Sequence, residues 1–278
     1  MFWIRLRSSI ILVIAALFLL LTGGWVLAAG LFVLSLIAFW ELVRAAETGR
    51  QPSGKNRLGV LECIGFAGTA VYYAALFFGA EPVYWLGILG AVFLGMMAAY
   101  VITFPDLQAG QVMTAFFSFF YGPVLFSFIY LTRELPGGIY MVWLIFISSW
   151  ICDTCAYLSG MAFGKHKLAP VLSPKKSVEG AVGGVLGSAL VGALFGHLFL
   201  NMVFEGQEMA AVCALIGGAG AVISQIGDLA ASGIKRNHGI KDYGKLIPGH
   251  GGVMDRFDSV LFTAPIIYYL AILLIRFE

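Results

Sequence analysis

Residues 179–203 read EGAVGGVLGSALVGALFGHLFLNMV, and the only acidic or strongly basic residue in this stretch is Glu179 at its start. About 20 predominantly apolar residues suffice for a helix to cross the hydrocarbon core of a bilayer. A small residue recurs at every fourth position: Gly180, Gly184, Ser188, Gly192 and Gly196. This spacing places the small residues along one ridge, where a neighbouring helix can approach closely. The stretch therefore predicts a membrane-spanning helix packed inside a bundle.

The rest of the chain repeats this apolar pattern. Of its 278 residues, 60% are hydrophobic and only 12% are charged, and the mean hydropathy is +0.92. Soluble domains carry about a quarter charged residues, so we expect an integral membrane protein. Apolar runs of spanning length lie at 8–23, 25–43, 58–79, 83–104, 110–132, 138–160, 179–203, 209–233 and 257–275.

These runs predict an all-α fold, a polytopic integral membrane helical bundle of about nine transmembrane helices. Five spans lie in residues 1–135, and residues 136–278 are expected to form a C-terminal catalytic region. Arg5 and Arg7 ahead of the first run resemble a signal peptide. The apolar character continues past Gly23 and Gly24 as far as Trp40, however, so a retained helical hairpin is the preferred interpretation.

Lysine and arginine are unevenly distributed between the predicted loops. If the N-terminus is cytoplasmic, every one of the 17 basic residues except Arg133 and Arg276 falls on the cytoplasmic side. Cytoplasmic loops of membrane proteins carry such an excess of basic residues. We therefore expect a multi-pass protein of the cell (inner) membrane, with the loops 161–178 and 234–256 in the cytoplasm.

The second of these loops belongs to a polar stretch, residues 232–258, which reads SGIKRNHGIKDYGKLIPGHGGVMDRFD. Charge placed against a bilayer is costly, so such a stretch is by default a functional hypothesis. Its cations suit phosphates, its carboxylates suit a metal ion, and the backbone amides of its glycines suit an anion. This mixture predicts a site that handles phosphate groups.

Acidic residues of the later spans gather in the predicted cytoplasmic half: Asp153, Glu179, Asp228, Asp255 and Asp258. Asp228 shares a helix face with Ser232 and Lys235 if the helix continues. Carboxylates that converge from separate helices supply the hard oxygen ligands that magnesium prefers. For Asp255 and Asp258 an alternative stays open, because acidic residues also favour helix N-termini for purely structural reasons.

The segment Pro248-Gly249-His250-Gly251-Gly252 leads directly into the last span. Glycine lets backbone N–H groups approach an anion, and a helix N-terminus attracts one. His250 could donate to a phosphate, act as an acid or base, or simply hold the loop. A second cluster joins Asp153 to Lys175, Lys176 and Ser177. This cluster is either a substrate site or a basic loop that contacts acidic lipid headgroups.

On these two clusters the chain resembles the phosphatidate cytidylyltransferases, also called CDP-diacylglycerol synthases. The stretch from Ser232 to Asp258 fits the family pattern at every fixed position, and the run from Asp153 to Gly180 fits as well. The C-terminal half carries this similarity, whereas the N-terminal half matches only as a bundle of apolar helices. One position departs from the pattern: Ala231 stands where relatives often have an acidic residue before the serine.

The resemblance implies the reaction of CTP with phosphatidate to give CDP-diacylglycerol and pyrophosphate, catalysed by a homodimer among membrane lipids and without a nucleic-acid partner. It implies that Asp228 and Asp255 bind Mg²⁺, and it allows a second, monovalent cation such as K⁺. The residues expected to be catalytic are Asp228, Asp255, Lys235, Arg236 and Asp258. Those expected to bind substrate are Ser232, Lys241, Asp242, His250, Gly251, Gly252, Arg256, Asp153, Lys175, Lys176 and Ser177.

A polytopic transporter of a phosphorylated or cationic solute is the main alternative. Transporters place ionisable residues near the bilayer midplane, on broken helices of paired repeats. In this chain the acidic residues gather toward one leaflet, and no matching halves are visible in the sequence. Metal-dependent release of pyrophosphate from CTP in the presence of phosphatidate distinguishes the two interpretations.

Overall fold

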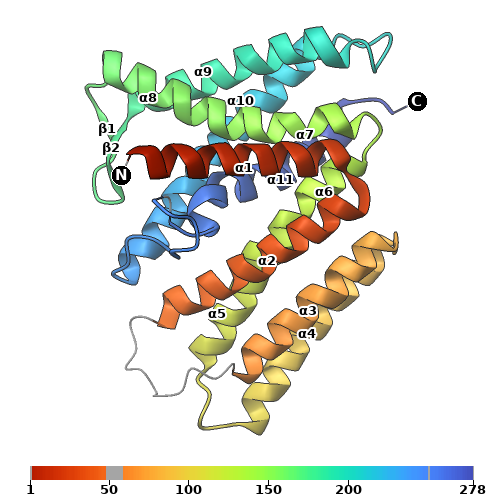
Figure 1. Ribbon diagram of the computed structural model, residues 1–278, viewed down its shortest axis with the longest axis vertical. Coiled ribbons are helices and arrows are strands. Elements are labelled where there is room, and N and C mark those ends of the chain that lie inside the picture. The colour runs from red at the N-terminus through yellow and green to blue at the C-terminus, as the bar shows by residue number, and fades with distance from the viewer. Residues whose placement is uncertain (1, 48–58, 250, 278) are drawn as a thin grey trace. The chain divides into compact units, whose positions relative to one another are not determined.

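The computed structural model describes residues 2–47, 59–249 and 251–277, and these are overwhelmingly helical (Figure 1). The chain divides into two compact units. Unit 1 comprises Met1–Ser127 and His238–Arg256, and unit 2 comprises Phe128–Asn237 and Phe257–Glu278. The loop around residues 238–256 therefore belongs with the N-terminal helices rather than with the rest of the C-terminal half. The assignment of catalysis to residues 136–278 stays a prediction.

Within the described residues, eight helical stretches are long and apolar enough to cross a membrane. They are Gly24–Ala46, Val60–Phe77, Pro82–Ile102, Ala109–Glu134, Gly138–Phe163, Val178–Leu200, Met209–Asn237 and Met254–Leu274. These match eight of the nine runs and confirm the all-α polytopic fold. The first predicted span lies in α1 (Phe2–Thr22), whose apolar stretch Ile10–Thr22 is shorter than the other eight, so a ninth span stays a prediction.

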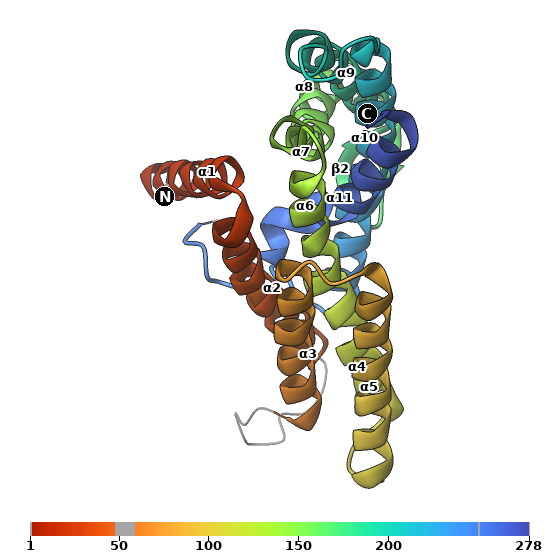
Figure 2. The same cartoon turned by 90° about the vertical axis from the view of Figure 1, so that its right-hand side faces the viewer.

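Unit 1 begins with a helix pair that differs from a simple hairpin. Helix α1 meets α2 (Gly24–Glu47) at Gly23 and Gly24, which have φ angles of 64° and 49°. Only glycine adopts this left-handed conformation readily. Two such residues in succession give an abrupt turn, and α1 runs at a steep angle to α2 (Figure 2). The remaining helices of unit 1 are α3 (Val60–Phe77), α4 (Pro82–Ile102) and α5 (Ala109–Phe119).

A few buried hydroxyl groups tie these apolar helices together. Helix α5 continues through a π-helical turn, η1 (Phe120–Val124), into α6 (Leu125–Glu134). The turn contains Pro123, and Tyr73 of α3 donates a hydrogen bond of 3.3 Å to its carbonyl oxygen. The Tyr73 hydroxyl also lies 2.7 Å from Ser35 Oγ of α2. Because an unpaired polar group is costly in an apolar interior, these bonds specify how α2, α3 and η1 meet.

Unit 2 contains the glycine-rich helix. Its elements are α7 (Gly138–Phe146), η2 (Ile147–Ile151), α8 (Cys152–Phe163), the strands β1 (Lys167–Ala169) and β2 (Ser173–Ser177), α9 (Val178–Phe195), η3 (Gly196–Leu200), α10 (Met209–Asn237) and α11 (Met254–Leu274) from Phe257 onward. The first turn of α11, up to Arg256, belongs to unit 1. Helices α8 and α9 lie side by side, as Figures 1 and 2 both show.

The ridge of small residues on α9 is the surface that packs, as predicted. A Cβ atom added to Gly184 would lie 2.9 Å from the carbonyl oxygen of Cys152 in α8. One added to Gly192 would lie 2.6 Å from the carbonyl oxygen of Cys213 in α10. Real Cβ atoms do not approach this closely, so any larger residue would push the helices apart. The four-residue glycine spacing therefore sets the close packing of α9 between α8 and α10.

The loop 161–178 contains structure that the all-α expectation did not include. Strands β1 and β2 pair in an antiparallel hairpin, the only named strands within the described part of the chain. The hairpin connects α8 to α9 and carries Lys175 and Lys176 on its second strand. It therefore gives a defined backbone to residues that the sequence placed in a loop.

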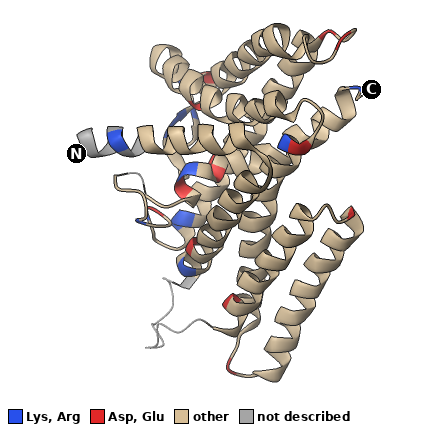
Figure 3. Ribbon diagram, turned by 45° about the vertical axis from the view of Figure 1, so that its right-hand side comes forward, with Lys and Arg blue, Asp and Glu red and all other residues tan. Residues whose placement is uncertain are grey.

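The surfaces of the helices agree with a lipid environment. Helix α4 is apolar on all sides, and many of its large residues are exposed, among them Leu86, Leu94 and Ile102. Among the residues drawn in colour, Figure 3 shows long helical stretches without Lys, Arg, Asp or Glu. A soluble protein rarely exposes apolar patches of this extent, so these faces are suited to contact lipid chains.

Candidate active site

Unit 2 brings together five of the charged residues singled out in the sequence. Asp153 lies on α8, Lys176 on β2, Asp228 and Lys235 on α10, and Asp258 on α11. The ammonium of Lys176 forms an ion pair with Asp228 Oδ2. The two side chains are 25% and 31% exposed. The pair is therefore desolvated in part yet still open to a ligand.

Electrostatic interactions link the rest of this group. The carboxylate of Asp153 is repelled by Asp228 and attracted by the ammonium of Lys176. The carboxylate of Asp258 is repelled by Asp228 and Asp153 and attracted by the ammonium of Lys235. We call these five residues the charge cluster: three carboxylates and two ammonium groups contributed by four elements. Such a cluster can hold cations on its carboxylates and phosphate oxygens on its ammonium groups.

A glycine explains how α10 and α11 place two of these carboxylates. A Cβ atom on Gly227 would lie 2.9 Å from Phe262 Cβ and 3.0 Å from the carbonyl oxygen of Asp258. The absence of a side chain at this position therefore lets α10 and α11 touch next to Asp228. Asp258 is only 8% exposed there, and its Oδ1 accepts a hydrogen bond from the backbone N–H of Ser259.

The end of the hairpin is held by two caps. Ser177 Oγ accepts a hydrogen bond of 3.1 Å from the backbone N–H of Gly180, so Ser177 caps the N-terminus of α9. Glu179 accepts hydrogen bonds from the backbone N–H groups of Lys165 and His166, and its Oε1 lies 2.6 Å from His166 Nδ1. These contacts fix the strand that carries Lys176. The capping role of Ser177 is observed, and its role in substrate binding stays a prediction.

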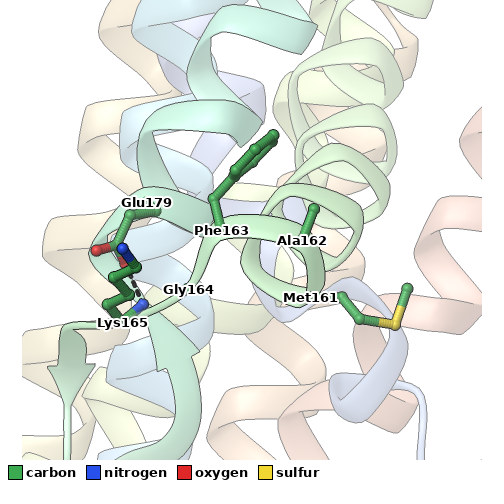
Figure 4. Close-up of a pocket in the computed structure, with 6 residues that line it drawn as sticks. All are labelled: Met161, Ala162, Phe163, Gly164, Lys165 and Glu179. Carbon is green, nitrogen blue, oxygen red and sulfur yellow. Dashed lines mark hydrogen bonds between the residues drawn. The ribbon is translucent and has the colours of Figure 1, made fainter.

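Beside this capped end lies an open pocket of about 540 Å³ (Figure 4). Its lining comes from the end of α8, the following turn and the start of α9: Met161, Ala162, Phe163, Gly164, Lys165 and Glu179. In Figure 4 a dashed line joins the backbone of Lys165 to Glu179. The carboxylate of Glu179 is therefore bound to the backbone of the pocket lining, whereas the side chains that interact electrostatically with Asp228 belong to the charge cluster.

Unit 1 holds the connecting loop between α10 and α11, residues 238–253. Ile247 and Gly251 exchange backbone hydrogen bonds across a tight turn. Gly249 and Gly251 have φ angles of 79° and 93° there, which favour glycine. Residues of the glycine-rich segment 248–252 thus take part in a turn, and its residue His250 lies outside the described residues.

The first turn of α11 is occupied by carboxylates of the protein itself. Asp255 Oδ2 accepts hydrogen bonds from the backbone N–H groups of Tyr243, at 2.8 Å, and Gly252, at 2.9 Å. The next two N–H groups, of Val253 and Met254, donate to Glu41 of α2 at 3.1 and 2.9 Å. The sequence predicted that amides of this region would meet an anion. The anions that they meet in the structure are these two side chains.

The other predicted residues take no part in the contacts described above. Ser232 is half-buried near the C-terminal end of α10, and Arg236 is exposed in its last turn. Also exposed are Lys175, Lys241, Asp242 and Arg256. Their positions leave them able to reach a ligand from solvent. Their assignment to substrate binding stays a prediction.

Glu41 is the residue that sequence reasoning missed. It is 6% exposed and lies within the predicted second span, between Trp40 and Leu42. An ionisable residue inside an apolar span is expensive and so carries a functional hypothesis by itself. The sequence therefore carries a signal at Glu41.

Comparisons with known proteins agree over nearly the full length of the chain. The sequence profile of the Cytidylyltransferase family matches residues 3–274. A protein of Staphylococcus aureus (strain COL) called phosphatidate cytidylyltransferase is 33% identical over 276 residues, 97% of this chain and 98% of the relative. Proteins with the same name from Staphylococcus epidermidis (strain ATCC 12228 / FDA PCI 1200) and Staphylococcus saprophyticus are 32% identical over the same shares of both chains.

Proposed function

The chain belongs to the cytidylyltransferase family, and we propose from this that it transfers the cytidylyl group of CTP to phosphatidate, giving CDP-diacylglycerol and pyrophosphate for phospholipid biosynthesis. The observation that carries the proposal is similarity across 97% of the chain to proteins named for this activity. The charge cluster adds a physical reason, because its mixture of carboxylates and ammonium groups suits a reaction between two polyanions. The transporter interpretation is set aside, because the matched proteins are transferases.

The reaction itself dictates what the protein must supply. An oxygen of the phosphatidate phosphate attacks the α-phosphorus of CTP, and the bond from that phosphorus to the oxygen bridging it to the β-phosphate breaks. The nucleophile is a phosphate monoester with a second pKa of about 6, so it is mostly dianionic at neutral pH. A strong general base is therefore unnecessary. The protein must instead hold two repelling anions in line and neutralise the charge that grows on pyrophosphate.

We assign these tasks to the residues predicted from the sequence. Lys235, Arg236 and Ser232 contact phosphate oxygens, and Asp258 holds Lys235 in place through their charge interaction. Lys176 balances Asp228 before substrate arrives and then interacts with a substrate phosphate. The other substrate contacts are assigned to Asp153, Lys175, Ser177, Lys241, Asp242, His250, Gly251, Gly252 and Arg256. The amides of Gly251 and Gly252 already bond within the protein, so these glycines contribute shape rather than free donors.

The carboxylates fit a magnesium ion that arrives with CTP. Across the residues that the structure describes, no three His, Cys, Asp or Glu side chains converge on a ready-made metal site. Magnesium is commonly held by only one or two carboxylates together with substrate phosphates and water. Asp228 and Asp255 are the residues that we propose as its ligands. When bound, the ion supplies positive charge to the triphosphate. We extend the proposal to a monovalent cation such as K⁺, to which we assign no residue.

The location of the protein follows in part from its composition. The eight apolar helices make it a multi-pass membrane protein. We propose the cell (inner) membrane as its site and a homodimer as its working form. We further propose that the active site faces the cytoplasm, where CTP is made and where the basic residues are expected to lie.

The activity is tested by following both products from purified protein in phosphatidate-containing micelles. We expect CDP-diacylglycerol and pyrophosphate in equal amounts, only when CTP, phosphatidate and Mg²⁺ are all present. EDTA should reduce both products to background, and excess Mg²⁺ should restore them. Pyrophosphate formed without phosphatidate, or solute uptake by vesicles without product, would instead indicate a hydrolase or a transporter.

The orientation is tested by labelling single cysteines in a variant that lacks the four native ones. Helix α10 has 29 residues, which at 1.5 Å per residue is about 43 Å, longer than the roughly 30 Å core of a bilayer. Its two ends should therefore face opposite sides. A cysteine at Asp242 should react with an impermeant thiol reagent only after cells are opened, and one at Glu205 should react in intact cells. The reverse pattern would contradict a cytoplasmic active site.

A further inference from the structure

Glu41 occupies an unusual place for a carboxylate. It lies in α2 within a long apolar stretch, and only 6% of its surface is exposed. A buried charge is strongly unfavourable unless hydrogen bonds or an opposite charge compensate it. The contacts of Glu41 therefore indicate what its charge is needed for.

Both carboxylate oxygens of Glu41 bind the beginning of α11. Oε1 accepts a hydrogen bond from the N–H of Val253 at 3.1 Å, and Oε2 accepts one from the N–H of Met254 at 2.9 Å. Met254 is the first residue of α11. The first N–H groups of a helix have no partner inside the helix, and the positive end of the helix dipole lies there. Glu41 thus caps α11 from a helix more than two hundred residues earlier in the chain.

The connecting loop is shaped around this carboxylate. A Cβ atom at Gly244 or at Gly252 would collide with the carboxylate of Glu41. A Cβ atom on Gly244 would also lie 3.1 Å from Gly252 Cα. Neither glycine has a positive φ angle. Close approach of the Glu41 carboxylate and of the loop backbone explains why both positions are glycine. Gly244 and Gly252, two separate positions of the 232–258 stretch, therefore both depend on Glu41 of α2.

The same turn holds Asp255. Gly252 donates its N–H to Asp255 Oδ2, while the next two N–H groups donate to Glu41. Three consecutive amides are therefore divided between two carboxylates, one of which we propose as a metal ligand. A displacement of Glu41 would release the peptide groups at 253 and 254 and with them the position of Asp255.

We propose that Glu41 is a positioning residue for the reaction: its carboxylate holds the first turn of α11, and through that turn Asp255, in the conformation that binds the metal–CTP complex. This inference rests on the proposed function. It assigns a role in catalysis to a residue of the N-terminal helices, outside both polar clusters of the sequence.

Two backbone donors, one on each oxygen, favour an ionised carboxylate over a polar group of similar size. Glutamine has one acceptor oxygen, and its amide group would face the second backbone N–H donor. Aspartate is shorter but keeps two acceptor oxygens and the charge. If Glu41 acts through its charge and its two acceptors, Glu41→Asp retains more activity than Glu41→Gln. If Glu41 only fills space, the isosteric Glu41→Gln is the milder change.

The experiment compares Glu41→Gln and Glu41→Asp with Glu62→Gln, the same chemical change in α3 of unit 1. We expect Glu41→Gln to lower kcat by about 10- to 100-fold, the usual effect of losing a residue that orients a metal ligand. It should also raise the Mg²⁺ concentration needed for half-maximal rate. Glu41→Asp should lie between Glu41→Gln and the wild type, and Glu62→Gln should match the wild type in both measurements.

Hydrogen–deuterium exchange gives a readout that does not depend on activity. In Glu41→Gln, peptides covering residues 243–256 should exchange faster than in the wild type, because Val253 and Met254 lose an acceptor. Peptides of α9 should be unchanged. Equal exchange at 243–256 together with a normal Mg²⁺ requirement would overturn the proposal.

Gly252→Ala provides a second route if Glu41→Gln fails to accumulate in the membrane. It adds a methyl group against the same carboxylate without changing any charge. We expect the same rise in Mg²⁺ requirement and the same faster exchange, and in a viable double variant with Glu41→Asp the two losses should not multiply. Independent, multiplicative losses would overturn the proposal. A wild-type protein that makes no CDP-diacylglycerol would refute the proposed function instead, and the exchange result would still report on the Glu41 contact.

Discussion

Asp228→Asn is expected to lower kcat by at least about a hundredfold while the protein still inserts into the membrane. A bound metal ion stabilises charge in the transition state by several kcal/mol, and each 1.4 kcal/mol is a factor of ten in rate. Asparagine is nearly isosteric but neutral, so it binds such an ion poorly. Initial rates with both substrates saturating, measured over a wide range of Mg²⁺ concentrations, test this result.

The ion pair with Lys176 offers a competing explanation, because Asp228→Asn breaks that pair as well. Lys176→Met separates the two explanations, since it removes the same ion pair but leaves the carboxylate in place. We expect Lys176→Met to raise the KM for a substrate without raising the Mg²⁺ requirement. A Mg²⁺ dependence shifted equally in both variants would show that the ion pair, not metal binding, is the function of Asp228.

Asp255→Asn extends this test to the second proposed ligand. Oδ2 of Asp255 accepts hydrogen bonds from Tyr243 and Gly252, and the amide oxygen of asparagine can accept both. A structural role carried by these two bonds would therefore survive the substitution, whereas a metal-binding role would not. Asp106→Asn, in the exposed turn between α4 and α5, is the matched control. Either active-site variant retaining more than about a tenth of normal activity would contradict its assignment as a metal ligand.

The second large effect is expected from swaps that preserve charge at the end of α10. Lys235→Arg and Arg236→Lys should each lower activity by one to several orders of magnitude, mainly in kcat. Arginine presents a planar fork and lysine a point charge, so the two are poorly interchangeable at a site that grips a phosphate. The loss falls on kcat if the contact strengthens as charge moves onto pyrophosphate. Steady-state kinetics with both substrates saturating measures it.

A structural role at this position predicts the opposite result. Basic residues in the last turn of a helix stabilise it through their charge alone, and charge is unchanged in both swaps. Arg133→Lys is the control, because Arg133 also lies in the last turn of a helix, α6, and outside the polar stretch. If Lys235→Arg and Arg236→Lys both have near-normal rates, equal to that of Arg133→Lys, then Lys235 and Arg236 have a structural role and do not bind phosphate.

The sequence alone determined the helices. A bilayer core offers no water to backbone N–H and C=O groups, so long apolar runs must form helices that satisfy these groups internally. Eight of the nine predicted runs are helices of spanning length. The spacing of glycines on α9 also determined its packing face, because helix periodicity converts a four-residue repeat into a ridge. Both inferences depend only on neighbours along the chain.

The sequence also identified the residues of the charge cluster, but not their pairing. Asp228 was grouped with Ser232 and Lys235 because they share one helix face. The structure pairs it with Lys176 of a hairpin that was expected to be a loop. Strand pairing in a short polar segment depends on what packs beside it. Here Glu179 binds the backbone of Lys165 and His166, more than ten residues earlier in the chain, and no local pattern encodes that contact.

Glu41 marks the limit of what the sequence determined. Its partners, Val253 and Met254, are more than two hundred residues away, and backbone amides have no residue type that a pattern could detect. The glycine-rich segment 248–252 was interpreted as space for a bound anion, and only the tertiary structure shows that the carboxylate of Glu41 lies against Gly252 and Gly244. Local periodicity determines where helices lie. Contacts between distant segments decide which charges compensate one another, because burial forces each polar group to find its partner in three dimensions.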